Sequence, residues 1–216
     1  MQSRRRFSAV LRDFSAELER LSRLDRDNQR RLTTRGCRLA AGAISRRQLY
    51  MLTEAILFYA YRSYENFVHD VFVLHCLEKP NLAGRKARSY LRPKTFLHAE
   101  ELMQSSLRFL DWSNPDDIVK RAELYLRDGE PIKAVVTANR TLLHELRQIR
   151  NHVAHNSTAS GRLYINLLQR KFGTKPLHVP SVGEFLLRSD PAAPHRYFLL
   201  IYLEEFERMA RALAGR

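Results

Sequence analysis

The stretch RNHVAHN, residues 150–156, places an arginine, two asparagines and two histidines within seven positions. The guanidinium of Arg150 is always charged, and its planar fork matches the oxygens of a phosphate group. Histidine as a residue type titrates near neutral pH, so His155 can take a proton from a ribose 2′-hydroxyl or give one to a leaving 5′-oxygen. Together these groups suffice for metal-independent cleavage of RNA, with a 2′,3′-cyclic phosphate as product.

The spacing within this stretch creates a geometric difficulty. Five steps along an ideal α-helix turn about 500°, so Arg150 and His155 point about 140° apart. Either the helix ends or distorts within residues 151–154, or two chains that meet across a two-fold axis assemble the site. Asn151 and His155 are four residues apart and share a helix face, so Asn151 can orient the imidazole or the scissile phosphate.

Three further residues are candidates for RNA binding or for support of the site. Arg147 begins an overlapping pair with His152 at the same spacing, and either side chain can contact a phosphate or belong to a solvated helix turn. Glu65 lies on an apolar stripe of a long helix, where a carboxylate is costly unless a cation pairs with it. Arg150, the arginine of the 150–156 region, is a candidate partner of Glu65. The alternative is that its carboxylate reaches water at the edge of a helix bundle.

Motifs for other kinds of catalysis are missing from the sequence. It contains no GxxxxGK[ST] or GxGxxG phosphate loop and no G-x-S-x-G elbow. His152 and His155 could share a metal ion on one helix face, but no carboxylate nearby supplies the further ligands that a metal needs. Cys37 and Cys76 lack the spacing of a zinc site or a disulfide framework, and we expect inert thiols in a reducing cytoplasm. We therefore expect neither a metal nor another cofactor.

The charge of the chain favours a polyanionic partner. The formal net charge is +14 at pH 7, and residues 1–47 contain thirteen arginines against five acidic residues. Such a field concentrates nucleic acid at the surface, although basic surfaces also serve acidic proteins and membranes, and arginine-rich codon usage also contributes. No apolar segment is long enough to span a bilayer, and acidic residues interrupt the region where a signal peptide needs an apolar run. We expect a cytoplasmic protein that binds RNA and no membrane.

The apolar periodicity predicts an all-α chain. Helices are expected over residues 5–30, 46–78, 97–110, 115–127 and 132–153 and, after a loop rich in glycine and proline, from residue 195 to the C-terminus. Ser113 or Asn114 is expected to cap the helix over 115–127. Alternation typical of strands is not sustained anywhere. We expect residues 1–44 to form a basic amphipathic helical arm and residues 45–216 to form one helical domain.

The pattern Arg150-Asn151-x3-His155 resembles the R-x4-6-H motif of HEPN-domain ribonucleases. The approach TLLHELRQIRNHVAHNS is similar, and the aromatic segment YRSYENF at residues 61–67 resembles the RiboL-PSP type of HEPN domain. The resemblance covers residues 45–216. It implies a HEPN-like helical bundle that forms a homodimer and brings two motifs into one cleft that cuts RNA. It also implies the catalytic roles for Arg150, Asn151 and His155.

The same resemblance implies a toxin or an antiphage defence effector, with a possible antitoxin or defence-system protein as partner. In one subgroup, which is neutralised by nucleotidyltransferase partners, a tyrosine stands two residues after the motif histidine; this chain has Ser157 there. Control by modification of that tyrosine is therefore not expected. Two alternatives stay open. One is a non-catalytic HEPN-like module that binds RNA or protein, with Arg150 paired to Glu65; the other is a DNA-associated defence subunit positioned by the basic arm.

Overall fold

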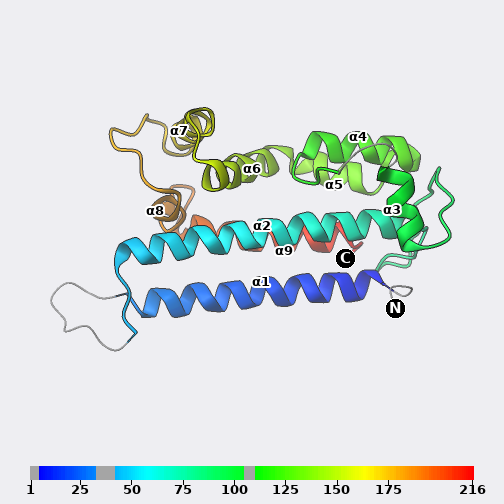
Figure 1. The fold of residues 1–216 in the computed structure, drawn as a ribbon, viewed down its shortest axis with the longest axis horizontal. Helices are drawn as coiled ribbons and strands as arrows, with labels where there is room; N and C mark the ends of the chain where they lie inside the picture. Colours follow the sequence, from blue (N-terminus) through cyan, green and yellow to red (C-terminus); the bar gives the residue numbers. More distant parts are fainter. Residues whose placement is uncertain (1–4, 33–41, 105–109) are drawn as a thin grey trace. The chain divides into compact units, whose positions relative to one another are not determined.

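The computed structural model describes residues 5–32, 42–104 and 110–216. It is mostly helical, with 69% helix, 6% strand and nine α-helices among the described residues (Figure 1). The expectation of an all-α fold is confirmed. None of the helices in these ranges combines the length and the apolar character that crossing a bilayer requires.

The elements follow one another in a simple order along the chain. They are α1 (Phe7–Arg30), α2 (Arg46–Cys76), α3 (Phe96–Gln104), α4 (Pro115–Tyr125), the 3₁₀ turn η1 (Arg127–Gly129), α5 (Ile132–Ala138), α6 (Arg140–His155), α7 (Thr158–Phe172), α8 (Val182–Leu186), β1 (Ser189–Asp190), β2 (Ala193–Tyr197) and α9 (Phe198–Leu213). Helix α4 is capped as expected, because the Asn114 side chain accepts a hydrogen bond from the Asp116 amide.

The expected helix over residues 132–153 is divided in two, at Asn139. The backbone there leaves the helical region, with φ −111° and ψ 13°. The Asn139 side chain also donates a hydrogen bond to the carbonyl of Val135 over 2.7 Å. A side-chain amide that bonds the backbone competes with the helical hydrogen bonds, and this local competition ends α5 and lets α6 start in a new direction.

The closing helix begins three residues later than expected. Residues 195–197 belong to β2, which pairs antiparallel with β1, so that Ser189 lies opposite Tyr197 and Asp190 opposite Ala193. In the sequence, the apolar periodicity of α9 continues toward the N-terminus into residues 195–197. Only their pairing with β1 shows that these residues form a strand and not the first turn of the helix. Helix α3 is described as far as Gln104, and residues 105–109 of the helix expected over 97–110 lie outside the described residues.

The chain divides into two compact units. Unit 1 comprises Met1–Ala16, Arg62–Arg147 and Phe206–Arg216, and unit 2 comprises Glu17–Tyr61 and Gln148–Glu205. Helices α1, α2, α6 and α9 each contribute residues to both units. The separate arm expected over residues 1–44 stays a prediction.

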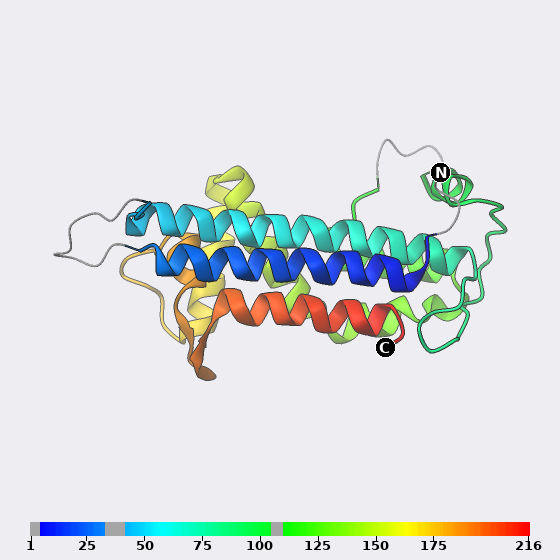
Figure 2. The ribbon, with the colours of Figure 1, turned by 90° about the horizontal axis from the view of Figure 1, so that it is seen from below.

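An aromatic cluster joins three helices in the core of unit 1. The Tyr64 ring of α2 lies 6.2 Å from the Phe14 ring of α1 and 4.9 Å from the Phe206 ring of α9, measured between ring centroids. The segments of α1, α2 and α9 that belong to unit 1 therefore pack side by side (Figure 2). Burial of these rings supplies much of the hydrophobic stabilisation of the unit.

A second aromatic cluster forms the core of unit 2. Phe185 of α8 stacks on Phe198 of α9 with 4.5 Å between ring centroids, and Tyr164 of α7 lies 6.1 Å from Phe185. Tyr164 is buried and its hydroxyl donates a hydrogen bond to the Ser181 carbonyl over 3.2 Å. This cluster fixes α7 beside the loop that leads into α8.

A buried histidine in unit 1 predicts loss of stability in acid. His75 is 0% exposed, and burial lowers its pKa to about 4 from 6.5. As the pH falls from 6.5 to 4, the unfolded chain binds a proton at this position that the native protein does not, so acid favours unfolding. Across this window His75 should cost on the order of 3 kcal/mol of unfolding free energy.

Urea unfolding at pH 7 and pH 4.5 measures this effect. The control is His75→Gln, because a glutamine amide retains a donor for the Leu213 carbonyl but does not titrate. The variant should lose less free energy between the two pH values than the natural protein loses. Equal losses in both proteins would contradict the role of His75.

Candidate functional site

The 150–156 region lies at the C-terminal end of an unbroken helix. Helix α6 runs from Arg140 through His155, and only at Asn156 does the backbone enter the left-handed region, with φ 41°. The Asn156 amide still donates a hydrogen bond to the His152 carbonyl over 2.9 Å. Of the two alternatives stated above, the one in which the helix ends or distorts within residues 151–154 is therefore wrong. On this regular helix Arg150 and His155 project about 140° apart and are separated by about 7.5 Å along the axis.

Arg150 is held in one orientation by residues of unit 2. Its Nη1 atom donates a hydrogen bond to Oδ1 of Asn151 over 3.0 Å. Its Cζ atom lies 5.7 Å from the centroid of the Phe58 ring and 6.0 Å from that of the Tyr61 ring. Aromatic faces attract a guanidinium electrostatically, and they restrict the rotamers of a half-buried arginine. The result is a pre-oriented cation that suits a developing negative charge.

The side chain of Asn151 is hydrogen-bonded to Arg150 in the structure. Its carbonyl oxygen accepts the bond from Arg150, and in the described part of the chain its side chain makes no other hydrogen bond. The amide nitrogen of Asn151 therefore keeps two N–H groups that can donate to a phosphate oxygen. Arg150 and Asn151 together form what we call the Arg–Asn pair.

His155 differs from Arg150 in being open to solvent. It is the last residue of α6 and its side chain is exposed. Within the described residues no hydrogen bond or ion pair holds its imidazole. Either ring nitrogen can thus meet a substrate hydroxyl, as a general base requires.

Ser157, at the position where the subgroup mentioned above has tyrosine, has a structural role. Its side chain accepts a hydrogen bond from the Ser160 amide, and the Ser160 side chain accepts one from the Ser157 amide, so the two residues form a capping box at the start of α7. Helix α7 consequently begins within three residues of the end of α6. This short connection between α6 and α7 fixes the position of His155 at the end of α6.

His152 packs into unit 2 on the side of α6 opposite Arg150. Its ring stacks on the Tyr164 ring with 4.8 Å between centroids, and its Nδ1 atom lies 3.3 Å from Oγ of Ser160. Burial lowers the pKa of His152, so the neutral form is favoured. His152 thus supports the packing of α7 against α6, and a contact of this residue with RNA stays a prediction.

Arg147 has its partners in unit 1. Its Nε atom donates a hydrogen bond to Oγ of Ser113 over 3.3 Å, and its Nη2 atom lies 3.7 Å from a carboxylate oxygen of Asp111. Glu65 is half-buried on α2 and is not without a partner. The binding of RNA by Arg147 and the pairing of Glu65 with an arginine of the 150–156 region both stay predictions.

The cysteines and the possible metal ligands offer no further reactive site among the described residues. Cys76 is buried, and burial raises the pKa of its thiol to about 12, so the thiolate needed for reactivity is not populated near neutral pH. Cys37 lies outside the described residues. Among the described residues, no three His, Cys, Asp or Glu side chains gather in a way that could hold a metal ion.

Comparisons with family models, with curated proteins and with solved structures give no match for this chain. Its function is therefore inferred from its own residues and their geometry.

Proposed function

We propose that this chain is a metal-independent endoribonuclease of HEPN type that acts in the cytoplasm as a toxin or antiphage effector. The observation that carries the proposal is the Arg–Asn pair, which Phe58 and Tyr61 support, on the same helix end as an exposed His155. An oriented guanidinium and an accessible imidazole are the two groups that cleavage through the 2′-hydroxyl needs.

The proposed reaction is an internal transesterification of RNA. His155 takes the proton of a ribose 2′-hydroxyl, and the oxygen attacks the adjacent phosphorus. Arg150 stabilises the negative charge of the pentacovalent phosphorane, with the Asn151 amide as a further donor. The bond to the 5′-oxygen breaks, this oxygen takes a proton from water, and the proton held by His155 neutralises the hydroxide that remains. The products are a 2′,3′-cyclic phosphate and a 5′-hydroxyl.

We infer that one chain does not present its own Arg150 and His155 to the same phosphate, because α6 is regular and the two side chains leave it in different directions. We therefore assign Arg150 of one copy and the partner's His155 to one site, and the reciprocal pair to a second. A two-fold symmetric dimer supplies both pairs at once.

An exposed apolar face of α2 is the surface proposed for this dimer. Met51, Leu52 and Tyr59 lie within about 100° of one another around the helix, and Met51 and Tyr59 are 62% and 54% exposed. This α2 face adjoins the Arg–Asn pair, since Phe58 contacts both the Tyr59 ring, at 6.3 Å between centroids, and the Arg150 guanidinium. Contact between two α2 faces would bring the two α6 ends toward each other.

Charge on the α2 face should separate the copies. In Met51→Glu/Tyr59→Glu, a dimer would bury carboxylates without partners, so the dissociation constant should rise by about a hundredfold or more and RNA cleavage should fall with it. Sedimentation equilibrium measures the first effect. Leu177→Glu, at another exposed apolar residue of unit 2, is the matched control and should leave the dimer intact. A natural protein that stays monomeric at micromolar concentration would contradict the composite site.

The nuclease activity is tested with a labelled RNA in EDTA. The purified protein should cut it and leave a 2′,3′-cyclic phosphate, whereas the same sequence with 2′-deoxyribose should stay intact because it lacks the nucleophile. An RNA that binds and is not cut would contradict the nuclease and would favour a binding module.

A further inference from the structure

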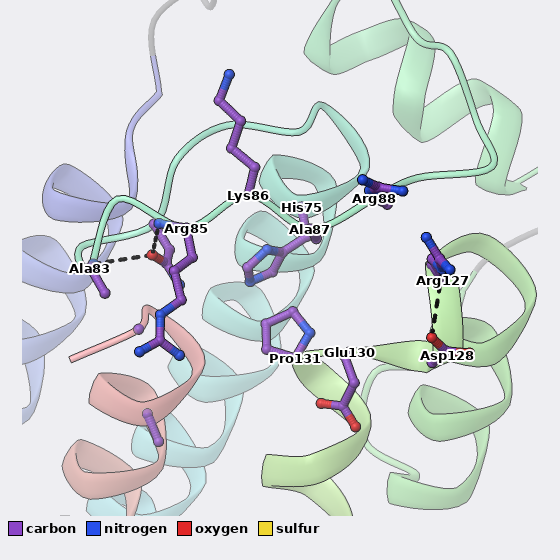
Figure 3. A pocket seen from close by; sticks show the side chains of 13 residues that line it. His75, Ala83, Arg85, Lys86, Ala87, Arg88, Arg127, Asp128, Glu130 and Pro131 are labelled. Carbon is purple, nitrogen blue, oxygen red and sulfur yellow. Dashed lines mark hydrogen bonds and ion pairs between the residues drawn. The ribbon is translucent and has the colours of Figure 1, made fainter.

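A pocket of about 410 Å³ lies in unit 1, and none of the residues that line it is proposed for cleavage. Two loops form most of its wall: residues 81–88, which follow α2, and residues 127–131, which follow α4 (Figure 3). The end of α9 contributes Ala212 and Gly215. The volume falls in the range of sites for small molecules.

The rim of this pocket is basic. Four cations line it, Arg85, Lys86, Arg88 and Arg127, against the two carboxylates of Asp128 and Glu130. Arg127 lies 3.8 Å from the Asp128 carboxylate. No ion pair within the described residues holds the side chains of Arg85, Lys86 or Arg88. In Figure 3, Lys86 points away from the pocket, while Arg85 and Arg88 stand on either side of His75. Two arginines thus remain for an anionic ligand.

Hydrogen bonds hold the arginine-bearing loop in place. The Asn81 side-chain oxygen accepts from the amides of Ala83 and Arg85, at 3.1 and 2.9 Å. At the far end of the loop the Arg127 amide donates to the Arg88 carbonyl over 2.8 Å. The positions of both arginine backbones are consequently set before any ligand arrives, which reduces the entropy cost of binding.

The floor of the pocket contains an acceptor that lacks a donor. His75 is 0% exposed, and its Nε2 atom lies 3.3 Å from the Leu213 carbonyl. A carbonyl can only accept, so Nε2 carries the proton and Nδ1 is an acceptor. Within the described residues nothing donates to Nδ1. A buried polar atom of this kind normally has a partner, and a molecule at the bottom of the pocket would provide one.

We propose that this pocket binds a small phosphomonoester that carries a ring with a hydrogen-bond donor. The phosphate lies between Arg85 and Arg88, the ring lies against Ala87 and Pro131, and the donor faces Nδ1 of His75. A small molecule fits better than a nucleic-acid backbone, because the acceptor belongs to a fully buried residue that a polymer backbone at the basic rim would not reach. The proposal is independent of the nuclease proposal, because the two sites share no residue.

Calorimetric titration of the full chain at pH 8 tests the proposal, with 5′-AMP, adenosine and inorganic phosphate as probes. AMP should bind, and adenosine and phosphate should each bind at least about tenfold more weakly, since each lacks one of the two groups. Arg85→Gln/Arg88→Gln should weaken AMP binding by about thirtyfold or more. Lys79→Gln/Arg92→Gln removes the same charge from unit 1 outside this pocket and should change it by less than about threefold.

The ¹⁵N resonance of His75 Nδ1 provides a second readout. It should shift when AMP is added and not when sulfate, an anion that has no donor, is added. Absence of AMP binding at millimolar concentration would overturn the proposal, as would equal weakening by the two double variants. A short RNA that binds His155→Ala protein through Arg85 and Arg88, while AMP does not bind, would also overturn it in favour of a polymer site.

Discussion

His155→Ala and Arg150→Ala should each lower the rate of RNA cleavage in EDTA by about a thousandfold. The first removes the base that takes the 2′-hydroxyl proton. The second removes the cation that meets the charge of the phosphorane. Initial rates with a labelled RNA at fixed protein concentration measure both effects.

Matched controls are available in the same unit. His178 is, like His155, an exposed histidine, and Arg162 is an arginine on the surface, so His178→Ala and Arg162→Ala remove the same kinds of group elsewhere. Both controls should retain cleavage within about threefold, as expected of surface positions outside the site. Arg150→Lys keeps the charge and loses the fork, so its rate should fall between those of the natural protein and Arg150→Ala. Cleavage that persists in His155→Ala would show that another residue, or another protein, cuts the RNA.

Gly183→Ala should lower the free energy of unfolding by about 3 kcal/mol. A Cβ atom at Gly183 would lie 2.1 Å from the carbonyl oxygen of Tyr50 and 2.5 Å from its carbonyl carbon. The obstacle is the backbone of α2, which a rotamer change does not move. The same glycine donates its amide hydrogen to Oε1 of Glu54 over 2.8 Å, so a shift of α8 away from Tyr50 would also lengthen this hydrogen bond.

Gly161→Ala is the control for this substitution, and it should raise the free energy of unfolding instead of lowering it. A Cβ atom there meets only Cε1 of His152, at 3.8 Å, an ordinary contact. Gly161 lies inside α7, where alanine is favoured over glycine by roughly 0.5–1 kcal/mol. Urea unfolding of the two variants side by side measures the difference. Equal stability of Gly183→Ala and the natural protein would contradict the close approach of α8 to α2.

The course of the long helices was predictable because their signals are local. Apolar periodicity predicts α1 and α2, and Asn114 with Pro115 predicts the start of α4. The errors lie where local signals conflict. Asn139 sits within an unbroken apolar period, and only its bond to Val135 shows that α5 ends there. Residues 195–197 join a strand because β1 pairs with them, and a sequence window around them contains no information about that pairing.

The candidate site was predictable only in part, because some of its contacts join residues that are far apart in the sequence. Residue types and spacing single out Arg150, Asn151 and His155. The support of Arg150 by Phe58 and Tyr61 comes from α2, about ninety residues away in the chain, and was missed, although the aromatic stripe of α2 was visible in the sequence. The ring that holds His152, Tyr164, lies on the next helix, and the sequence offers no local signal for it.

The regular geometry of α6 is the reason for proposing a site that two copies share. Because Arg150 and His155 leave one unbroken helix in different directions, the proposed site takes the arginine from one copy and the histidine from the other. Two inactive variants should then complement each other. A mixed dimer of Arg150→Ala and His155→Ala chains contains one site with both groups intact and one site with neither.

The most direct measurement is RNA cleavage in EDTA by an equimolar mixture of the Arg150→Ala and His155→Ala proteins, after subunits have exchanged. Random pairing gives half mixed dimers with one working site each, so the mixture should recover about a quarter of the natural activity. Each variant alone should stay about a thousandfold slower than the natural protein. A mixture as inactive as its two components would contradict a site shared between two copies.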